Sequence, residues 1–347
     1  MQLHLDARDR ERWEALQDTE ARNDRVVRLL ATYLNEMPRF LTRRMVRDLA
    51  RDCSIPEENA FRVLFSAALG LDTPTNAEDR QLEKDYLAAG LARMDPTEAA
   101  RDAYVQTVAF PTARNGRWSF GSERYAPYEP FVRNSPVRTP AGLEIPQIGF
   151  FMEDFRFPAV RENGVEWMAV KPNEIATMRA PIAAARGHVV AFGLGLGYFA
   201  FHASNRDEVE RVTVVERDPA VIDLFRRHLL PQFPQKQKIR VVEGDAFAYA
   251  ETELPRAGAD VAFVDLWHDQ SDGLPLYLRM RRLEALSPGV AFHYWIETVL
   301  LSSLRRMVFD RIRDNGEGEI TSFSEIAFML SEPYLRSLAP KLRQTEE

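Results

Sequence analysis

Cysteine is almost absent from this chain, since Cys53 is the single thiol among 347 residues. One cysteine excludes an internal disulfide and a zinc site built on several thiolates. No stretch reaches the roughly 18–20 uninterrupted apolar residues of a membrane helix, because three glycines interrupt even Val189–Ala203. The first residues carry no apolar signal core, so nothing marks the chain for export and we expect a cytoplasmic protein without a membrane partner.

Lysine is also scarce, and positive charge does not predominate. Acidic residues number 52 against 45 basic ones, which gives a net charge of −7. A net-acidic chain lacks the electrostatic footprint of a general nucleic-acid binder, so nucleic acid is not an expected partner. With 45% hydrophobic and 28% charged residues, the composition is that of a globular protein with a substantial core, and the length suggests about two domains.

Three regions of the chain differ in pattern. Residues 1–110 space their apolar residues as helices do, and residues 111–184 are rich in aromatics and proline with strand-like alternation. Residues 185–347 begin with short apolar runs that alternate with amphipathic helices, the βαβ signature of a parallel sheet covered by helices. The predicted fold is therefore α/β: a Rossmann-like, doubly wound, mostly parallel sheet preceded by an N-terminal helical domain and a small β-hairpin region.

One pair of helices in the first region has the arrangement of a helix-turn-helix. Residues 41–52 predict the first helix, and Ser54-Ile-Pro-Glu57 predicts a capping box that starts the second, with Ser54 as its N-cap. Glu57 and Glu58 would face the phosphates of DNA and be repelled. We therefore interpret the pair as structural packing.

The middle region contains a predicted hairpin. Asn163-Gly164 suits the positive φ values of a tight turn between the apolar runs 155–160 and 165–170. Upstream, residues 117–131 are rich in aromatics and proline. Two interpretations of that segment are open: a loop that encloses a substrate, or a linker wrapped over a core.

The most informative segment passes from a buried strand into a helix through Gly193-x-Gly195-x-Gly197. Glycines there let the backbone turn sharply and let a ligand approach closely. The spacing differs from the dinucleotide fingerprint Gly-x-Gly-x-x-Gly, because Tyr198 stands three residues after Gly195. It fits instead the nucleoside loop of proteins that bind S-adenosylmethionine (AdoMet).

Acidic residues end or follow the next predicted strands. Glu216 closes the strand 211–216, Asp245 follows the strand that begins at Ile239, and Asp265 closes 259–265. A carboxylate in the position of Glu216 can accept hydrogen bonds from both ribose hydroxyls. Asp218, before Pro219, suits the N-cap of the next helix, so Glu216 is not needed for that role. Acids at the carboxyl ends of parallel strands lie where such sheets bind ligands.

Residues 186–300 resemble the class I AdoMet-dependent methyltransferase fold, and within it the spermidine-synthase-like branch. The resemblance rests on four motifs: Gly193-x-Gly-x-Gly197, Val215-Glu216-x-Asp218-x-x-Val221-Ile222, Gly244-Asp245-Ala246 and Leu286-x-Pro-Gly289. It implies that the three glycines of the first motif line the methionine and ribose portion of AdoMet. It also implies that Glu216 binds the ribose, that Asp245 and Ala246 bind the adenine, and that Asp265 lies near the methionine amine and the reaction centre.

The candidate catalytic residues lie in and just after the fourth predicted strand: Asp265, His268 and Asp269. His268 could act as a base with Asp269 beside it, while Trp267 could stack on a flat or cationic acceptor. The alternative is an exposed polar loop whose acids simply begin a helix at about Leu274. No metal site is expected, because no His-Glu-x-x-His or comparable spacing occurs.

Two segments depart from the spermidine-synthase pattern. That branch carries Tyr-His-Glu and Asp-Ser-Ser-Asp, where this chain has Glu174-Ile-Ala-Thr-Met178 and Asp265-Leu-Trp-His-Asp269. The leading interpretation is an AdoMet-dependent methyltransferase that acts on a small molecule and releases S-adenosylhomocysteine. The alternatives are a spermidine-synthase-like aminopropyltransferase and a non-catalytic AdoMet-binding module whose helical domain binds a partner. The methyl acceptor and the oligomeric state stay open.

Overall fold

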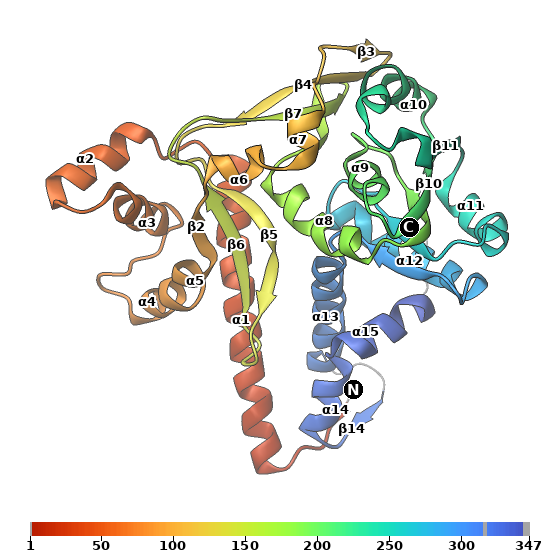
Figure 1. The fold of residues 1–347 in the computed structure, drawn as a ribbon. Coiled ribbons are helices and arrows are strands. Elements are labelled where there is room, and N and C mark those ends of the chain that lie inside the picture. Colours follow the sequence, from red (N-terminus) through yellow and green to blue (C-terminus); the bar gives the residue numbers. More distant parts are fainter. Residues whose placement is uncertain (1, 315–317, 343–347) are drawn as a thin grey trace.

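The computed structural model describes residues 2–314 and 318–342. Figure 1 shows the long helix α1 (Ala7–Glu36) on one side, a helix-covered sheet on the other, and the strands β4 (Trp118–Tyr125) and β7 (Phe155–Glu162) running between them. Within the described ranges, no helix combines the length and apolar character needed to cross a membrane.

The helix-covered sheet is parallel throughout. Its strands are β9 (Gly187–Phe192), β10 (Val209–Glu216), β11 (Ile239–Glu243), β12 (Val261–Val264) and β13 (Ala291–Tyr294). They lie in the order β11-β10-β9-β12-β13, so the chain starts at the centre, moves to one edge and then returns to the other side. This is a Rossmann-like, doubly wound sheet, as predicted, and its switch point lies between β9 and β12.

Helices connect these strands, and three of them begin at a side-chain cap. The connecting helices are α9 (Tyr198–Ser204), α10 (Pro219–Leu224), α11 (Ala246–Thr252) and α12 (Gln270–Leu283), with α8 (Pro172–Ala184) before the sheet and α13 (Glu297–Arg313) after it. Asp218, Asp245 and Asp269 each accept backbone N–H groups at the start of α10, α11 and α12. These caps satisfy donors that the first helical turn leaves without an intrahelical partner.

The N-terminal helices form a core of their own. The second half of α1 packs with α2 (Arg43–Cys53) and α3 (Glu57–Ala68), and the core includes Tyr33, Phe61 and Phe65, all at most 1% exposed. The expected capping box is wrong: Ser54 is the left-handed C-cap of α2, and Pro56 stands at the N-cap of α3 without a side-chain cap. Glu57 instead pairs with Arg47 and accepts a hydrogen bond from the Tyr128 hydroxyl. The short helices α4 (Ala77–Leu82), α5 (Ala88–Gly90), α6 (Pro96–Ala100) and α7 (Ala103–Thr107) follow.

The middle region divides between two sheets. Strands β5 (Phe131–Arg138) and β6 (Glu144–Phe150) join β2 (Leu91–Arg93) in a sheet that contributes Leu91, Ile145, Ile148 and Phe150 to the helical core. Strands β3 (Arg114–Asn115), β4, β7 and β8 (Val165–Ala169) form a separate antiparallel sheet. The predicted hairpin is confirmed: β7 and β8 pair around Asn163 and Gly164, whose φ values are 52° and 86°.

The N-terminal strand pairs with a segment that follows α13. Strands β1 (Gln2–Leu3) and β14 (Glu319–Ile320) pair in parallel, and Trp13 of α1 packs on Phe309 of α13 with 5.3 Å between ring centroids. The helices α14 (Phe323–Met329) and α15 (Glu332–Leu338) complete this end. Thus α1 contributes its first turns to the core of the parallel sheet and its later turns to the helical core.

A buried ionic contact joins β6 to α13. Arg305 is 4% exposed, and its guanidinium donates to the Glu144 carboxylate at 2.6 Å and to the Leu330 carbonyl at 3.0 Å. Glu144 also accepts from Arg138 and Ser302. Because a buried charge is stabilised only while its partners are in place, this contact helps to hold the helical core against the C-terminal helices.

Arg305→Met should destabilise the protein by about 3 kcal/mol, since it leaves the Glu144 carboxylate and the Leu330 carbonyl short of a buried donor. Urea unfolding measures this loss. The matched control is Arg313→Met, which removes an exposed arginine of the same helix paired with Asp310 and Asp314, and its effect should stay within about 0.5 kcal/mol. Equal effects of the two variants would contradict the role assigned to Arg305.

Candidate functional site

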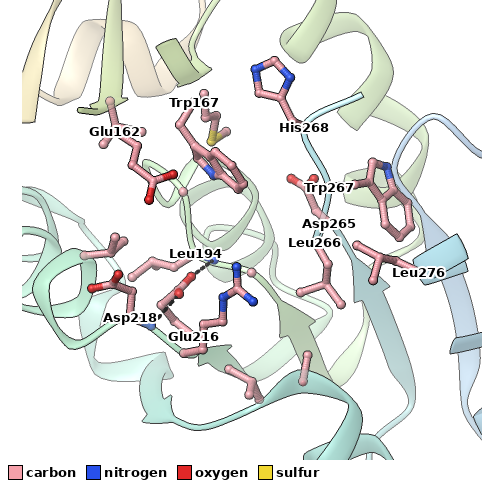
Figure 2. Close-up of a pocket in the computed structure, with 18 of the residues that line it drawn as sticks. Glu162, Trp167, Leu194, Glu216, Asp218, Asp265, Leu266, Trp267, His268 and Leu276 are labelled. Atoms are coloured by element: carbon pink, nitrogen blue, oxygen red, sulfur yellow. Dashed lines mark hydrogen bonds between the residues drawn. The ribbon is translucent and has the colours of Figure 1, made fainter. Parts of the chain in front are cut away.

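A cavity of about 210 Å³ lies at the carboxyl ends of β9, β10, β11 and β12. Residues that follow each of these strands line it: Gly193 to Gly195, Glu216 to Asp218, Gly244 to Phe247, and Asp265 to His268. The other wall comes from β4, β7, β8 and α8. Figure 2 shows Glu162 and Trp167 of that wall across the cavity from Glu216. A doubly wound sheet binds ligands at this edge, beside the switch point.

The protein's own packing requires glycine at two positions of this loop. Gly193 and Gly195 have φ values of 97° and 50°, which side-chain-bearing residues rarely adopt. A Cβ at Gly193 would lie 2.0 Å from the Asp265 carbonyl oxygen, and one at Gly195 would lie 2.1 Å from Met168 Sδ. Gly197 is the N-cap of α9 and does not line the cavity; its place is set by contact with Phe225. The structure therefore brings two of the three predicted glycines to the site.

Glu216 lies between the glycine loop and the next helix. Its carboxylate accepts the Leu194 N–H at 3.2 Å and the Asp218 N–H at 2.8 Å, and Figure 2 shows these two bonds. Burial raises the pKa of Glu216, and the backbone donors partly oppose that rise. Since each carboxylate oxygen has a second lone pair, the group can still accept from a ligand hydroxyl.

Asp218 caps α10, as the sequence predicts, by accepting the Ala220 N–H at 2.9 Å. Its other oxygen accepts from Trp118 Nε1 at 2.8 Å and from the Arg117 guanidinium at 2.7 Å. The strand β4 is thereby tied to the parallel sheet at the cavity wall. This second role, which no local pattern indicates, depends on a strand 100 residues earlier in the chain.

Asp245 and Ala246 also line the cavity, at the turn between β11 and α11. The Asp245 carboxylate accepts the backbone N–H groups of Phe247 and Ala248 at 3.0 and 2.9 Å, so it caps α11. Gly244, beside them, leaves open space: a Cβ there would have no neighbour within 4 Å.

Two acids face the cavity together. Asp265 follows β12, and burial raises its pKa to about 7. Glu174, in the first turn of α8, is 7% exposed, and its pKa is raised to about 8 by burial first and then by the charges of Asp265 and Glu166, against the opposing effect of Lys171. Neither carboxyl has a hydrogen bond or ion pair within residues 2–314 and 318–342. The sequence interpretation missed Glu174, although it is the only acid in the apolar helix α8 and that was a usable signal.

The predicted catalytic loop divides between cavity and helix. His268 is exposed at the cavity mouth, with its ring 5.8 Å from that of Trp167 and Nε2 3.2 Å from the Glu166 carbonyl oxygen. Asp269 does not line the cavity. It caps α12 in a capping box with Asp272, because that helix starts at Gln270 rather than near Leu274. Of the three expected catalytic residues, the structure brings Asp265 and His268 to the site and assigns Asp269 to the helix.

Four of the chain's five tryptophans line the cavity: Trp118, Trp167, Trp267 and Trp295. The indole of Trp295 donates to Thr177 at 2.9 Å, so it has a fixed orientation beside Glu174. Aromatic faces next to buried carboxylates attract cations. In the described part of the chain, no group of three or more His, Cys, Asp and Glu residues is arranged to hold a metal ion.

No model of a known protein family matches the chain, and no curated protein matches it. Among solved structures, it is similar to spermidine synthase from Thermotoga maritima, with 16% identity and a TM-score of 0.33 over 44% of this chain and 56% of that chain. A spermidine synthase in complex with the transition-state analogue AdoDATO gives 16% identity and a TM-score of 0.34, over 44% of this chain and 57% of that chain. The match thus spans little more than half of each of those two chains and less than half of this one. The Rossmann-like, doubly wound fold stands on the strand order itself.

Glu174→Gln should stabilise the protein at pH 8 by at least about 1 kcal/mol. Because the folded-state pKa is raised from 4.5 to about 8, the native protein keeps a proton that the unfolded chain has already released. The wild type therefore loses stability as the pH rises from about 5 to 8, and the glutamine variant is spared this loss.

Urea unfolding at pH 5 and pH 8 checks this difference. The control Glu251→Gln removes an exposed acid of α11 and should not alter the pH dependence. A Glu174→Gln variant that follows the wild type at both pH values would contradict the assignment.

Proposed function

We propose that the chain is an AdoMet-dependent methyltransferase that acts on a small amine. The observation that supports this best is the position of Glu216 beside the glycine loop at the carboxyl end of β10, with lone pairs left for a ribose diol. When bound, AdoMet would supply a methyl group already activated on a sulfonium. What the chain must add is orientation, exclusion of water and, for some acceptors, a proton acceptor.

The residues of the cavity fit the positively charged sulfonium of AdoMet. Glu174 and Asp265 place two ionisable carboxyl groups at one end, and the tryptophans offer aromatic faces beside them. A positively charged donor or acceptor favours ionisation of these carboxyls, because an opposite charge nearby stabilises the charged form. Arg117, a cation of the opposite wall, is engaged by Glu162 and Asp218.

The same acids suit an amine acceptor. An ammonium must lose a proton before its nitrogen can attack a methyl group. The Asp265 carboxyl, with a pKa of about 7, is half ionised near neutral pH and can take that proton. His268 lies at the exposed mouth, from which it can pass a proton to water.

Aminopropyl transfer is the second candidate, and the acid pair is the observation that favours it. Lys171, the cation that acts on Glu174, is itself paired with Glu166. A donor that ends in a primary ammonium could pair with the two acids. Because such a donor has no carboxylate, the cavity would need no cation beside Glu174 and Asp265. The two activities differ in the released nucleoside: S-adenosylhomocysteine for methyl transfer, methylthioadenosine for aminopropyl transfer. Binding without either product would indicate the non-catalytic module.

Calorimetry should show micromolar binding of S-adenosylhomocysteine and weaker binding of NAD, because the glycine spacing is wrong for a dinucleotide. Gly244→Val should weaken this binding at least tenfold, about 1.4 kcal/mol, by filling open space at the cavity wall without steric conflict in the protein.

Gly289→Val is the matched control: it also adds a side chain in open space, but away from the cavity. It should bind S-adenosylhomocysteine as the wild type does. The proposal fails if NAD binds more tightly than S-adenosylhomocysteine, or if Gly244→Val binds normally.

A further inference from the structure

Met168 of β8 lies directly on the glycine loop. Its Sδ accepts the Leu196 N–H at 3.3 Å and occupies the space beside Gly195, 2.1 Å from where a Cβ would stand. The residue belongs to the hairpin β7–β8, 28 positions before Leu196, and it lines the same cavity as Glu216. The space that the missing side chain of Gly195 opens is therefore filled by this thioether.

The contact is a weak one in chemical terms. A thioether sulfur is a poor acceptor compared with a carboxylate, hydroxyl or carbonyl oxygen. A methionine side chain has three rotatable bonds and adapts readily to a changed surrounding. Met168 can thus leave the loop by rotation of its own side chain, while the β-sheet that carries it stays anchored through Trp118 and Arg117 to Asp218.

We propose that Met168 determines the specificity of the donor subsite by occupying it in the unliganded protein. The inference rests on the proposed function. A ligand that lies against Gly195 must displace the thioether, and it binds well only if it offers an oxygen acceptor to the Leu196 N–H. When a ligand carries an oxygen at this position, the Leu196 N–H exchanges a poor acceptor, the thioether, for a better one. Ligands without one leave a backbone donor unpaired, which opposes their binding.

The hairpin therefore contributes more than a cover to the site. Each ligand of the glycine loop must displace the Met168 side chain, which costs free energy. The affinity for the preferred nucleoside is therefore lower than the loop alone would allow. Truncating the thioether side chain removes this displacement cost. It also removes the discrimination between ligands that differ in their acceptor oxygens.

The test compares Met168→Ala, Met168→Leu and the wild type by calorimetry with S-adenosylhomocysteine and with methylthioadenosine, which lacks the carboxylate. Met168→Ala should bind S-adenosylhomocysteine about tenfold more tightly and should bind methylthioadenosine with a larger gain still. Met168→Leu keeps the bulk that must be displaced and should stay near the wild type. Val165→Ala, an exposed residue of the same strand, is the control and should change neither affinity.

Weaker binding by Met168→Ala than by the wild type would overturn the proposal, because it would make the thioether a ligand-supporting group. Equal binding would overturn it as well. In either case the proposed function would stand, since an adenosyl ligand still binds. If neither protein binds an adenosyl ligand, the proposed function fails and the inference fails with it.

A second measurement observes the contact without depending on affinity. Amide hydrogen exchange at Leu196 should be faster in Met168→Ala than in the wild type, because the acceptor of that N–H is gone. In the wild type labelled with ¹³C-methyl methionine, saturating S-adenosylhomocysteine should shift the Met168 methyl resonance. A Met168 resonance that does not move on saturation would overturn the displacement.

Discussion

The carboxylate of Glu216 is the interaction on which the site depends. It bonds at once to the Leu194 N–H in the glycine loop and to the Asp218 N–H at the start of the next turn. Two neighbouring strand ends are thereby held in one arrangement. The bonds also bring a buried carboxylate to the cavity wall, where desolvation is offset only by hydrogen bonds to its charged form. Removing this group would loosen the loop, so Glu216 is a structural residue, and under the proposed function it is also the ribose ligand.

The rest of the cavity is built against that edge by parts of the chain outside the parallel sheet. Asp218 engages Trp118 and Arg117, and the loop itself engages Met168. Tyr104 of α7 donates from its hydroxyl to the Leu196 carbonyl at 2.5 Å, on the other side of the loop. The glycine loop is thus held from several sides. The packing of these segments against the parallel sheet also places the aromatic side chains and the acid pair at the cavity.

Local patterns predicted the scaffold well. Continuous apolar runs gave the parallel strands, Asn163-Gly164 gave the hairpin, and Asp218-Pro219 gave a helix start, because each is determined by residues close in sequence. The residues that complete the cavity were not predictable in this way. Glu174 reaches the site only because α8 packs against β5 and α9, and Met168 only because β8 lies on the loop. Ser54 failed as a predicted cap of α3 because it ends α2 in a left-handed conformation, and Glu57 has its partner in Tyr128, 71 residues away.

The central claim is that an adenosyl ligand binds along the carboxyl ends of β9 and β10 against Glu216. The most direct measurement is a crystal structure of the full chain grown with S-adenosylhomocysteine. We predict ligand density beside Gly195, with the ribose hydroxyls within hydrogen-bond distance of the Glu216 carboxylate and the Met168 thioether turned away from Leu196. An unoccupied cavity at saturating ligand, or density placed away from Glu216, would contradict the claim.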